Sequence, residues 1–523
     1  MTTAVATPAD SAQSGPLQSG PVLTGWRLAL AAFALGLANF VVVLDITIAN
    51  VSVPHIAGGL AISPTQGTWV ITSYAVAEAI TVPLSGWLAA RFGTVRWLII
   101  SMAGFGLFSL LCGVARTIEL LIVFRIFQGL MGGPLMPLTQ AMLTRIFPPE
   151  KIPMAMGLWA VTTITAPIVG PILGGTISDN WSWPWIFFIN LPVVIICVMI
   201  FVRLLPPFES VRERKRIDIV GLMLLIVWVG AFQLMLDTGR EYDWFGSPMI
   251  VALAIIAGLA FVAFVIWEWF DDNPVVDLRL LRDRTLSVSI IAISLGYGAF
   301  FGSVVLVPLW LQAILGYTAT EAGYATAALG TFAVLVAPVA AALLSRVDAR
   351  ITISLGMVWL AVMTLARLGW NTGSSLWDLL WPMLLQGMGM PFFFVGLSTL
   401  ALVSIPPERT ASAAGIMSFM RTASGAIATA LATTLWANFA AMSRTGLVPL
   451  VGDGEGAMAT MRAGGMSEEQ ARMALANMVD AQASTIAMHD IFLVVAALFL
   501  AAAAIVWLIP KPTGPLSPGD GGH

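Results

Sequence analysis

Charged residues are scarce in this chain of 523 residues, because Asp, Glu, Lys and Arg make up only 10% of it and hydrophobic residues 58%. A soluble globular protein carries about 25% charged residues, so the composition excludes an ordinary soluble fold. The apolar residues also occur in runs of about 20, the length that a helix needs to cross a bilayer. The sequence therefore predicts an all-α polytopic membrane protein embedded in a lipid bilayer.

Residues that bind metals or perform hydrolysis are equally scarce. The chain has two cysteines, Cys112 and Cys197, both inside apolar runs, and three histidines, none with a second ligand at a metal-binding spacing. It has no Ser/His/Asp set and no GxxxxGK[ST] motif, so hydrolysis and ATP-driven pumping are disfavoured. We therefore expect no enzyme, no cofactor, no metal site, no catalytic residue and no nucleic-acid partner.

Hydropathy predicts fourteen membrane-spanning helices, near 26–52, 66–90, 95–115, 119–146, 151–177, 184–204, 217–236, 247–270, 285–313, 321–345, 351–370, 377–404, 408–440 and 489–509. An even number of spans places both termini on one side. Lys and Arg are concentrated in the loops on that side, as in the run RERKR from Arg212, whereas the short loops opposite hold only Arg116 and Arg240. The positive-inside rule therefore places both termini in the cytoplasm.

The chain contains an internal repeat. The segment FQGLMGG at Phe127 resembles LQGMGMP at Leu385, and FPPEKIPMAMG at Phe147 resembles IPPERTASAAG at Ile405, both at a separation of 258 residues. Unrelated helices that share Gly and Pro by composition would not keep one separation across two helices and their loop. Parallel six-span repeats are the architecture of the major facilitator fold, with a substrate site at mid-depth between the halves.

The repeat predicts how the chain is divided. We expect an N-terminal six-helix half at 26–204, a linker with two inserted helices at 205–270, and a C-terminal six-helix half at 271–510 that contains an external loop at 441–488. The Pro-, Gly- and Ser-rich segments 1–25 and 511–523 are expected to be disordered cytoplasmic tails. Because the inserted helices lack a charge in their central apolar runs, we expect them at the periphery of the bundle.

Two acids interrupt the first apolar runs: Asp45 in VVVLDITIAN, and Glu78 near the middle of the second span. A charge at the bilayer centre costs at least about 2.5–3.5 kcal/mol, so such residues usually face a cavity and take part in ion movement. Arg125 in the fourth span needs a counter-charge, and Asp45 is the best candidate. We therefore predict proton coupling by Asp45, Glu78 and Arg125. The alternatives are a purely structural Asp45–Arg125 pair and a Glu78 that stays protonated.

Further polar and aromatic residues are candidates for a substrate cavity. Helical spacing puts Tyr74 on the face of Glu78, and Gln128 on that of Arg125. Arg421, near the middle of the thirteenth span, either pairs with a carboxylate across the cavity or attracts an anionic group of the substrate. Aromatic residues of the second half could line the cavity or face lipid. The predicted cavity residues are Tyr74, Gln128, Tyr297, Phe300, Phe392 and Arg421.

The fifth span contains APIVGPILGG, in which Pro167 and Pro171 remove backbone hydrogen bonds and bend the helix, while Gly170 and Gly174 permit close helix contact. Alone, this would describe any kinked and tightly packed helix. Together with LDITIANVSVP and RIFQGLMGGP, it resembles the motifs of the 14-span drug:proton antiporter family of the major facilitator superfamily. The segments QGTWVITSYAVAEAITVPLSGWLAARFG and GPILGGTISDNWSWPWIFFINLP are similar to the inner-membrane pumps of tripartite multidrug exporters in that family.

The resemblance implies a function and roles for particular residues. It implies proton-driven export of small hydrophobic drugs or toxic compounds across the bacterial inner membrane, with Asp45 as the coupling acid and Arg125 as the arginine of the fourth span. Gly170, Pro171, Gly174 and Gly175 would belong to the antiporter signature. An uncoupled facilitator, a nutrient symporter and a proton-coupled exporter of one metabolite, such as a fatty acid or siderophore, are the alternatives.

The external loop is the expected site of partner binding. SEEQARMALANMVDAQAS reads as a helix that Ser467 and Gln470 cap, and methionines give it a soft apolar surface. This helix could rest on its own membrane domain. The resemblance instead implies contact with a periplasmic adaptor (membrane fusion) protein, which would connect the pump to an outer-membrane channel.

Overall fold

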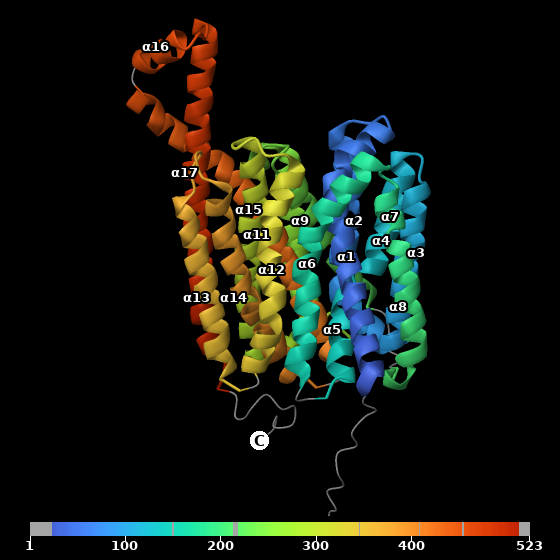
Figure 1. Ribbon diagram of the computed structural model, residues 1–523. Helices are drawn as coiled ribbons and strands as arrows, with labels where there is room; N and C mark the ends of the chain where they lie inside the picture. The colour runs from blue at the N-terminus through green and yellow to red at the C-terminus, as the bar shows by residue number, and fades with distance from the viewer. Residues whose placement is uncertain are drawn as a thin grey trace, which may run out of the picture.

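The computed structural model describes residues 23–148, 151–212, 218–344, 346–406, 408–451 and 454–511, and within these ranges the chain forms helices and no strand. The helices form one bundle, and a helical segment that includes α16 projects from its upper face (Figure 1). The expected tails fall almost wholly on residues 1–22 and 512–523, which lie outside the described part of the chain.

The helices follow the predicted order. The first half contains α1 (Gly25–Gly59), α2 (Pro64–Phe92), α3 (Thr94–Val114), α4 (Ile118–Gly132), α5 (Leu135–Ile146), α6 (Ile152–Asn180), α7 (Trp185–Phe188) and α8 (Asn190–Leu204). The inserted pair is α9 (Ile219–Thr238) and α10 (Pro248–Phe270). The second half contains α11 (Arg284–Ala313), α12 (Ala319–Leu344), α13 (Ala349–Ala366), α14 (Leu376–Val403), α15 (Thr410–Val451), α16 (Glu455–Ala463) and α17 (Glu468–Ile505).

Twelve of these segments are long and apolar enough to cross a membrane, with α4 and α5 counted together and α7 and α8 counted together. The thirteenth is α6, which bends by 40° where Pro167 lies. The remaining predicted span is α2, whose 29 residues include the polar Glu78 and Thr81, and these lower its mean hydropathy. A helix is therefore present at each of the fourteen predicted positions.

Local sequence signals explain where several helices begin. At the start of α2, Ser63 and Gln66 form a capping box and Pro64 occupies the first turn. Between α2 and α3, Gly93 has φ 95°, a left-handed conformation that glycine adopts without steric cost. Asp348 caps α13, and a hydrogen bond from the Arg350 side chain lowers the pKa of its carboxyl.

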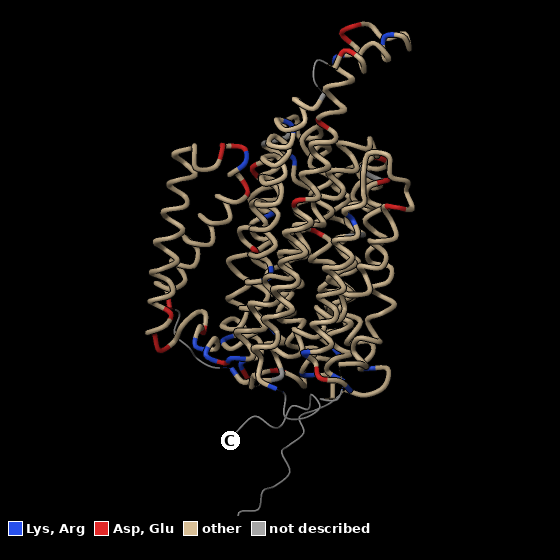
Figure 2. Tube along the Cα trace, turned by 90° about the vertical axis from the view of Figure 1, so that its left-hand side faces the viewer, with Lys and Arg blue, Asp and Glu red and all other residues tan. Residues whose placement is uncertain are grey.

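The packing of the two halves follows one pattern. In the first half α1 packs on α6 and α2 on α4, and in the second α11 packs on α15 and α12 on α14. The halves meet along two seams, one between α2 and α15 and the other between α6 and α12. Most Lys and Arg residues gather at the end of the bundle where α1 begins, which we call the basic face (Figure 2).

The inserted helices lie at the edge of the bundle. Helix α10 packs on α9, and α9 packs on α2 and α15, so the pair covers the α2–α15 seam from outside. The Trp228 ring on α9 meets the Phe419 ring on α15 at 5.4 Å, and Trp244 Nε1 donates a hydrogen bond to Thr434 Oγ1 at 3.0 Å. Helices α9 and α10, which are apolar along their central runs, thus lie at the periphery of the bundle.

The segment predicted as an external loop is mostly helix. Helix α15 continues to Val451, and α17 runs unbroken from Glu468 to Ile505, so both last spans extend beyond the bundle (Figure 1). The predicted capping box at Ser467 is present. Because the N-terminal part of α17 continues its span away from the bundle, the alternative of a loop helix that rests on the membrane domain is not observed there. Hydropathy could not show this, since polar helix outside a membrane resembles loop in composition.

Candidate functional site

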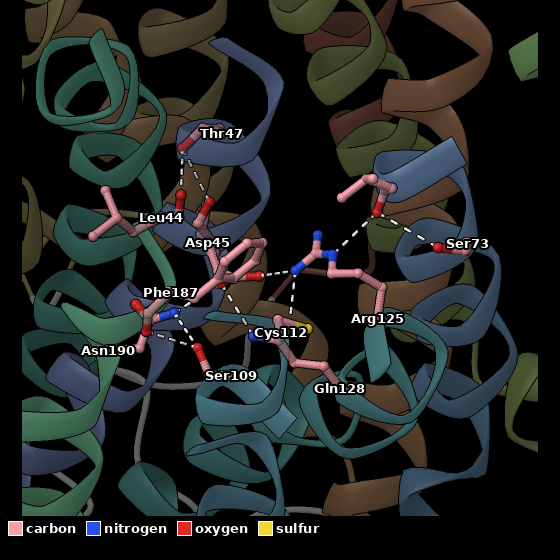
Figure 3. A network of polar contacts seen from close by, with 12 residues as sticks. Leu44, Asp45, Thr47, Ser73, Ser109, Cys112, Arg125, Gln128, Phe187 and Asn190 are labelled. Atoms are coloured by element: carbon pink, nitrogen blue, oxygen red, sulfur yellow. Dashed lines mark hydrogen bonds and ion pairs between the residues drawn. The ribbon is translucent and has the colours of Figure 1, made fainter. Parts of the chain in front are cut away.

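The first intramembrane acid meets the predicted arginine. Arg125 Nη1 on α4 lies 2.5 Å from Asp45 Oδ2 on α1, and both side chains are fully buried (Figure 3). Removing one partner of a buried ion pair costs about 3–5 kcal/mol, because the other charge is left uncompensated. The predicted contact between these two side chains is therefore present, and it couples α1 to α4.

Two amides complete the shell of donors around Asp45. Gln128 Nε2 donates to Asp45 Oδ1 at 3.1 Å, and Asn190 Nδ2 donates to the same oxygen at 2.7 Å (Figure 3). Asn190 also donates to Ser109 Oγ at 3.0 Å, which joins α3 and α8 to the network. Sequence analysis missed Asn190, although it stands as a lone amide in the apolar stretch IFFINLP. A neutral amide costs less to bury than a charge, so it gives a weaker signal.

Arg125 is held from the other side by α2. Its Nε donates to the backbone oxygen of Val70 at 3.0 Å, and its guanidinium lies 4.1 Å from the centroid of the Tyr74 ring. Nη2 has no hydrogen-bond partner among the described residues. Tyr74 and Gln128, which we predicted to line a cavity, are fully buried and belong to the shell around this ion pair.

The side of α2 that carries Thr81 packs closely against α4. A Cβ on Gly129 would lie 2.5 Å from the backbone oxygen of Tyr74, so glycine lets the two helices touch. The Thr81 hydroxyl is satisfied by the Ala77 carbonyl of its own helix at 3.0 Å. Glu78 is only 4% exposed, and the structure records no hydrogen bond or ion pair for its carboxyl within the described ranges.

The glycines of the antiporter-like motif lie beside Asp45. A Cβ on Gly170 would collide with the Thr47 side chain, and one on Gly174 would lie 2.8 Å from the backbone oxygen of Ile48. These glycines therefore set the contact between α6 and α1, within three residues of the buried acid. Gly175 differs, because a Cβ there would have no atom within 4 Å. Pro167 and Pro171 lie inside α6, next to its bend.

The second half contains a related network without an acid. Ser303 follows Asp45 by 258 residues, the separation of the repeat, and accepts a hydrogen bond at 2.8 Å from the buried Arg367. Arg367 also donates to Gln386, the repeat partner of Gln128. The position of the acid is thus occupied by a hydroxyl, and among the described residues only the first half pairs a fully buried carboxylate with a buried arginine.

The predicted aromatic residues divide into two groups. Tyr297 stacks on Phe301 at 4.7 Å, and both Tyr297 and Phe300 pack edge-on against Phe394. Phe392 does not join them, since it lines a separate groove of about 240 Å³ with Gly356, Trp359 and other residues of α12, α13 and α14. Leu355 in that groove is 63% exposed, so the groove opens on the outside of the bundle rather than between the halves.

Two six-helix halves with a buried charge network at the interface of several helices define a secondary transporter. The family model of the Major Facilitator Superfamily matches residues 35–429, and the chain belongs to that superfamily. Its fold also resembles the crystal structure of the human organic anion transporter MFSD10, with a TM-score of 0.54 at 13% identity, covering 92% of this chain and 99% of that one.

Several curated proteins are similar over nearly their whole length. The chain is 40% identical over 516 residues to the multidrug export protein EmrB of Escherichia coli K12, covering 97% of this chain and 100% of that protein. It is 42% identical to EmrB of Haemophilus influenzae, with 94% and 98% covered, and 40% identical to the fatty acid resistance protein FarB of Neisseria gonorrhoeae, with 96% and 99% covered. The chain is thus an EmrB-like member of the superfamily, which confirms the predicted resemblance.

Proposed function

We propose that this protein is a proton-driven antiporter that exports hydrophobic drugs or toxic compounds across the bacterial inner membrane. The chain is a multi-pass transporter rather than an enzyme by its family, and similarity to the EmrB proteins supports drug efflux as its activity. The single observation that supports proton coupling is the fully buried Asp45 carboxylate with its three donors.

The donor set makes the Asp45 network sensitive to a proton. An ionised carboxylate only accepts hydrogen bonds, whereas a protonated one carries a donor of its own. If Asp45 is protonated, its O–H donor faces an N–H donor of Arg125, Gln128 or Asn190, and the two cannot form a hydrogen bond. Protonation also removes the negative charge that compensates Arg125. Loading the proton loosens α1 from α4 and α8, and releasing it restores the pair. This is the kind of two-state contact that alternating access requires.

Contact between α1 and α6 can carry this change to the interface of the halves. Thr47, two residues from Asp45, donates to carbonyls of its own turn and packs against Gly170. Helix α6 in turn forms one of the two seams with the second half, against α12. A shift of α1 on protonation would thereby alter the position of α6 in that seam.

The driving force is adequate for export. One charge that crosses a membrane at about 100 mV is worth roughly 2.3 kcal/mol. Since 1.4 kcal/mol corresponds to a tenfold ratio, this sustains a concentration gradient of roughly 50-fold. We assign the basic face to the cytoplasm, together with both termini, because the positive-inside rule favours that orientation.

The projecting helices support a role in a tripartite efflux system. The extensions of α15 and α17 are linked by Arg444 Nε and Asp480 Oδ1 at 2.5 Å and expose Met442, Met473 and Met478. With the basic face in the cytoplasm, this segment stands in the periplasm (Figure 1). Its soft apolar surface fits a periplasmic adaptor protein, which would lead the substrate to an outer-membrane channel.

Efflux of a dye panel from proteoliposomes tests the proposal. With a proton gradient, wild type should export the dyes, collapse of the gradient should stop export, and Asp45→Asn should remove the effect of the gradient. The matched control is Gln233→Leu on α9, since among the described residues Gln233 bonds only within its own helix, to Asp237 at 3.1 Å. Export by the Asp45 variant at the wild-type rate would refute proton coupling through this residue.

A second candidate is export of one metabolite class. FarB is named for fatty acid resistance and is 40% identical to this chain, which favours a fatty acid as the substrate. Transport of a single chemical class from a mixed panel would support this candidate over multidrug efflux.

A further inference from the structure

Within the described ranges, the protein fully buries three arginines of the membrane interior, and two of them, Arg125 and Arg421, lie in the most contrasting environments. Arg125 is neutralised by Asp45, whereas Arg421 on α15, also fully buried, meets no carboxylate in the described part of the chain. One nitrogen of Arg421, Nη2, contacts Met136 Sδ at 3.0 Å and Ser418 Oγ at 3.1 Å. Nε and Nη1 have no hydrogen-bond partner there. Three of the five N–H donors of this guanidinium are thus without an acceptor.

Such an arginine is costly for the resting protein. Neutral contacts with a thioether and a hydroxyl do not replace the hydration of a cation, and an uncompensated buried charge is among the most destabilising features a protein can carry. Arginine also stays charged in proteins, so it cannot avoid the cost by losing its proton. Arg367 also lacks a carboxylate in the part of the chain that the structure describes, but a hydroxyl and an amide oxygen accept its hydrogen bonds. Most donors of Arg421 have no acceptor among the described residues, so an anion that is present at another stage of the transport cycle would complete its contacts.

The position of Arg421 fits a substrate site between the halves. It extends from α15 of the second half to Met136 on α5 and Trp159 on α6 of the first. Its guanidinium lies 4.5 Å from the Trp159 ring centroid and 5.6 Å from that of Tyr297 on α11. Both halves thus supply an aromatic face beside the charge, and such faces suit the apolar body of a ligand.

Burial along α15 changes at this residue. Residues 413–418, on the side of the basic face, are all buried, whereas within 422–440 only Gly425 and Ala432 are. Arg421 therefore lies at the boundary between the buried part of α15 near the basic face and the more exposed part that extends toward the other end of the bundle. An anion that enters along the interface of the halves would reach the guanidinium at the end of its path.

We propose that Arg421 binds the anionic group of the transported compound, so that the substrates include hydrophobic organic anions such as aromatic sulfonates and carboxylates. This inference rests on the proposed export function and assigns it a substrate class. Trp159 and Tyr297 receive the apolar body of the substrate, and the free N–H donors of Arg421 bind the charged group in charge-assisted hydrogen bonds. Neutral compounds use the same aromatic surfaces without the ionic contact.

The charge of the substrate also changes the energetics of export. An anion that leaves the cell and a proton that enters it move charge in the same electrical direction. For any number of protons, export of a monovalent anion therefore moves one more charge per cycle than export of a neutral compound. Its rate should depend more steeply on membrane potential.

The test uses two fluorescent probes with one apolar body, 8-anilinonaphthalene-1-sulfonate and the neutral N-phenyl-1-naphthylamine. The sulfonate stays ionised, so it cannot cross the bilayer as a neutral acid. Transport of each probe is measured in proteoliposomes with an imposed pH gradient. Arg421→Gln should lower transport of the sulfonate about tenfold or more, the size expected for loss of a charged hydrogen bond, and leave the neutral probe nearly unchanged. Arg421→Lys should retain most sulfonate transport.

The following results would overturn the proposal that Arg421 binds the anionic group. Equal loss of both probes in Arg421→Gln would assign Arg421 to structure and overturn the proposal, as would unchanged sulfonate transport. In wild-type liposomes, a potassium diffusion potential should accelerate the sulfonate more than the neutral probe, and equal acceleration would also overturn it. If neither probe responds to a pH gradient in wild type, the proposed function itself fails. Proton-driven transport of the neutral probe alone refutes only the anion site.

Discussion

At the scale of single residues, the most informative side chain is an amide that the sequence did not single out. Asn190 on α8 donates to both Asp45 and Ser109, so it connects the proposed coupling acid to α3 and α8. Asp45 and Arg125 could be predicted because a charge in an apolar run is costly and needs an explanation. Asn190 could not be predicted, because burying a neutral amide costs little free energy, so an Asn in an apolar run does not by itself indicate a functional site.

Replacing Asn190 should destabilise the first half. In Asn190→Ala one donor to the Asp45 carboxylate is lost, and we expect the free energy of unfolding to fall by about 1–3 kcal/mol, the usual cost of an unsatisfied buried group. Thermal unfolding of the purified protein in detergent measures this. The control is Asn180→Ala, since Asn180 is exposed and its side chain bonds, within the described part of the chain, only to the Thr176 carbonyl. Equal melting temperatures for the two variants would show that the Asn190 contacts contribute nothing.

At the scale of helices, the sequence predicted positions well and facing directions poorly. Each expected span is present as a helix, because length and hydropathy alone define it. Which side of a span faces a cavity is harder to predict, because both lipid and the protein interior favour apolar side chains. Phe392 and Phe394 illustrate this, since they are two residues apart yet line an outer groove and the Tyr297 cluster, respectively. Around Thr81, α2 packs against α4 because glycines permit close contact there.

The contact between α6 and α1 gives a prediction with a control inside one motif. In Gly170→Ala the new methyl group would collide with Thr47, so α6 must move away from α1, and transport should fall by about tenfold or more. Gly175→Ala should transport as wild type does, because no atom lies within 4 Å of its Cβ position. Dye efflux at matched protein amounts compares the two. Similar dye efflux by both variants would show that transport does not depend on the close contact between α1 and α6.

At the scale of the whole molecule, the two halves share one architecture but differ in the residues that they bury. The halves share one packing pattern, but among the described residues only the first pairs a fully buried acid with a buried arginine, while Ser303 stands in the corresponding place of the second. The 258-residue separation predicted the paired halves, since it is visible in short motifs. The capped helix from Ser467 was predicted, but the continuous extension of α15 and α17 beyond the bundle was not, because hydropathy does not register a polar helix outside the membrane.

The projection should matter only when partner proteins are present. Met473 and Met478 are 58% and 56% exposed on α17, so the double variant Met473→Asp, Met478→Asp should fold normally. It should retain dye transport in proteoliposomes and lose drug resistance in cells that contain the adaptor and outer-membrane channel. Arg472→Gln, an exposed change on the same helix, is the control. Full resistance in the double variant would argue against docking at this surface.

The central claim is that export is coupled to protons through Asp45, and direct measurement of proton movement tests it most directly. In proteoliposomes that contain a pH-sensitive dye, addition of substrate to wild type should cause proton movement opposite to the substrate. Asp45→Asn should abolish that signal while still exchanging labelled for unlabelled substrate, which shows that binding and access remain. Substrate-dependent proton movement of wild-type size in Asp45→Asn would contradict the account.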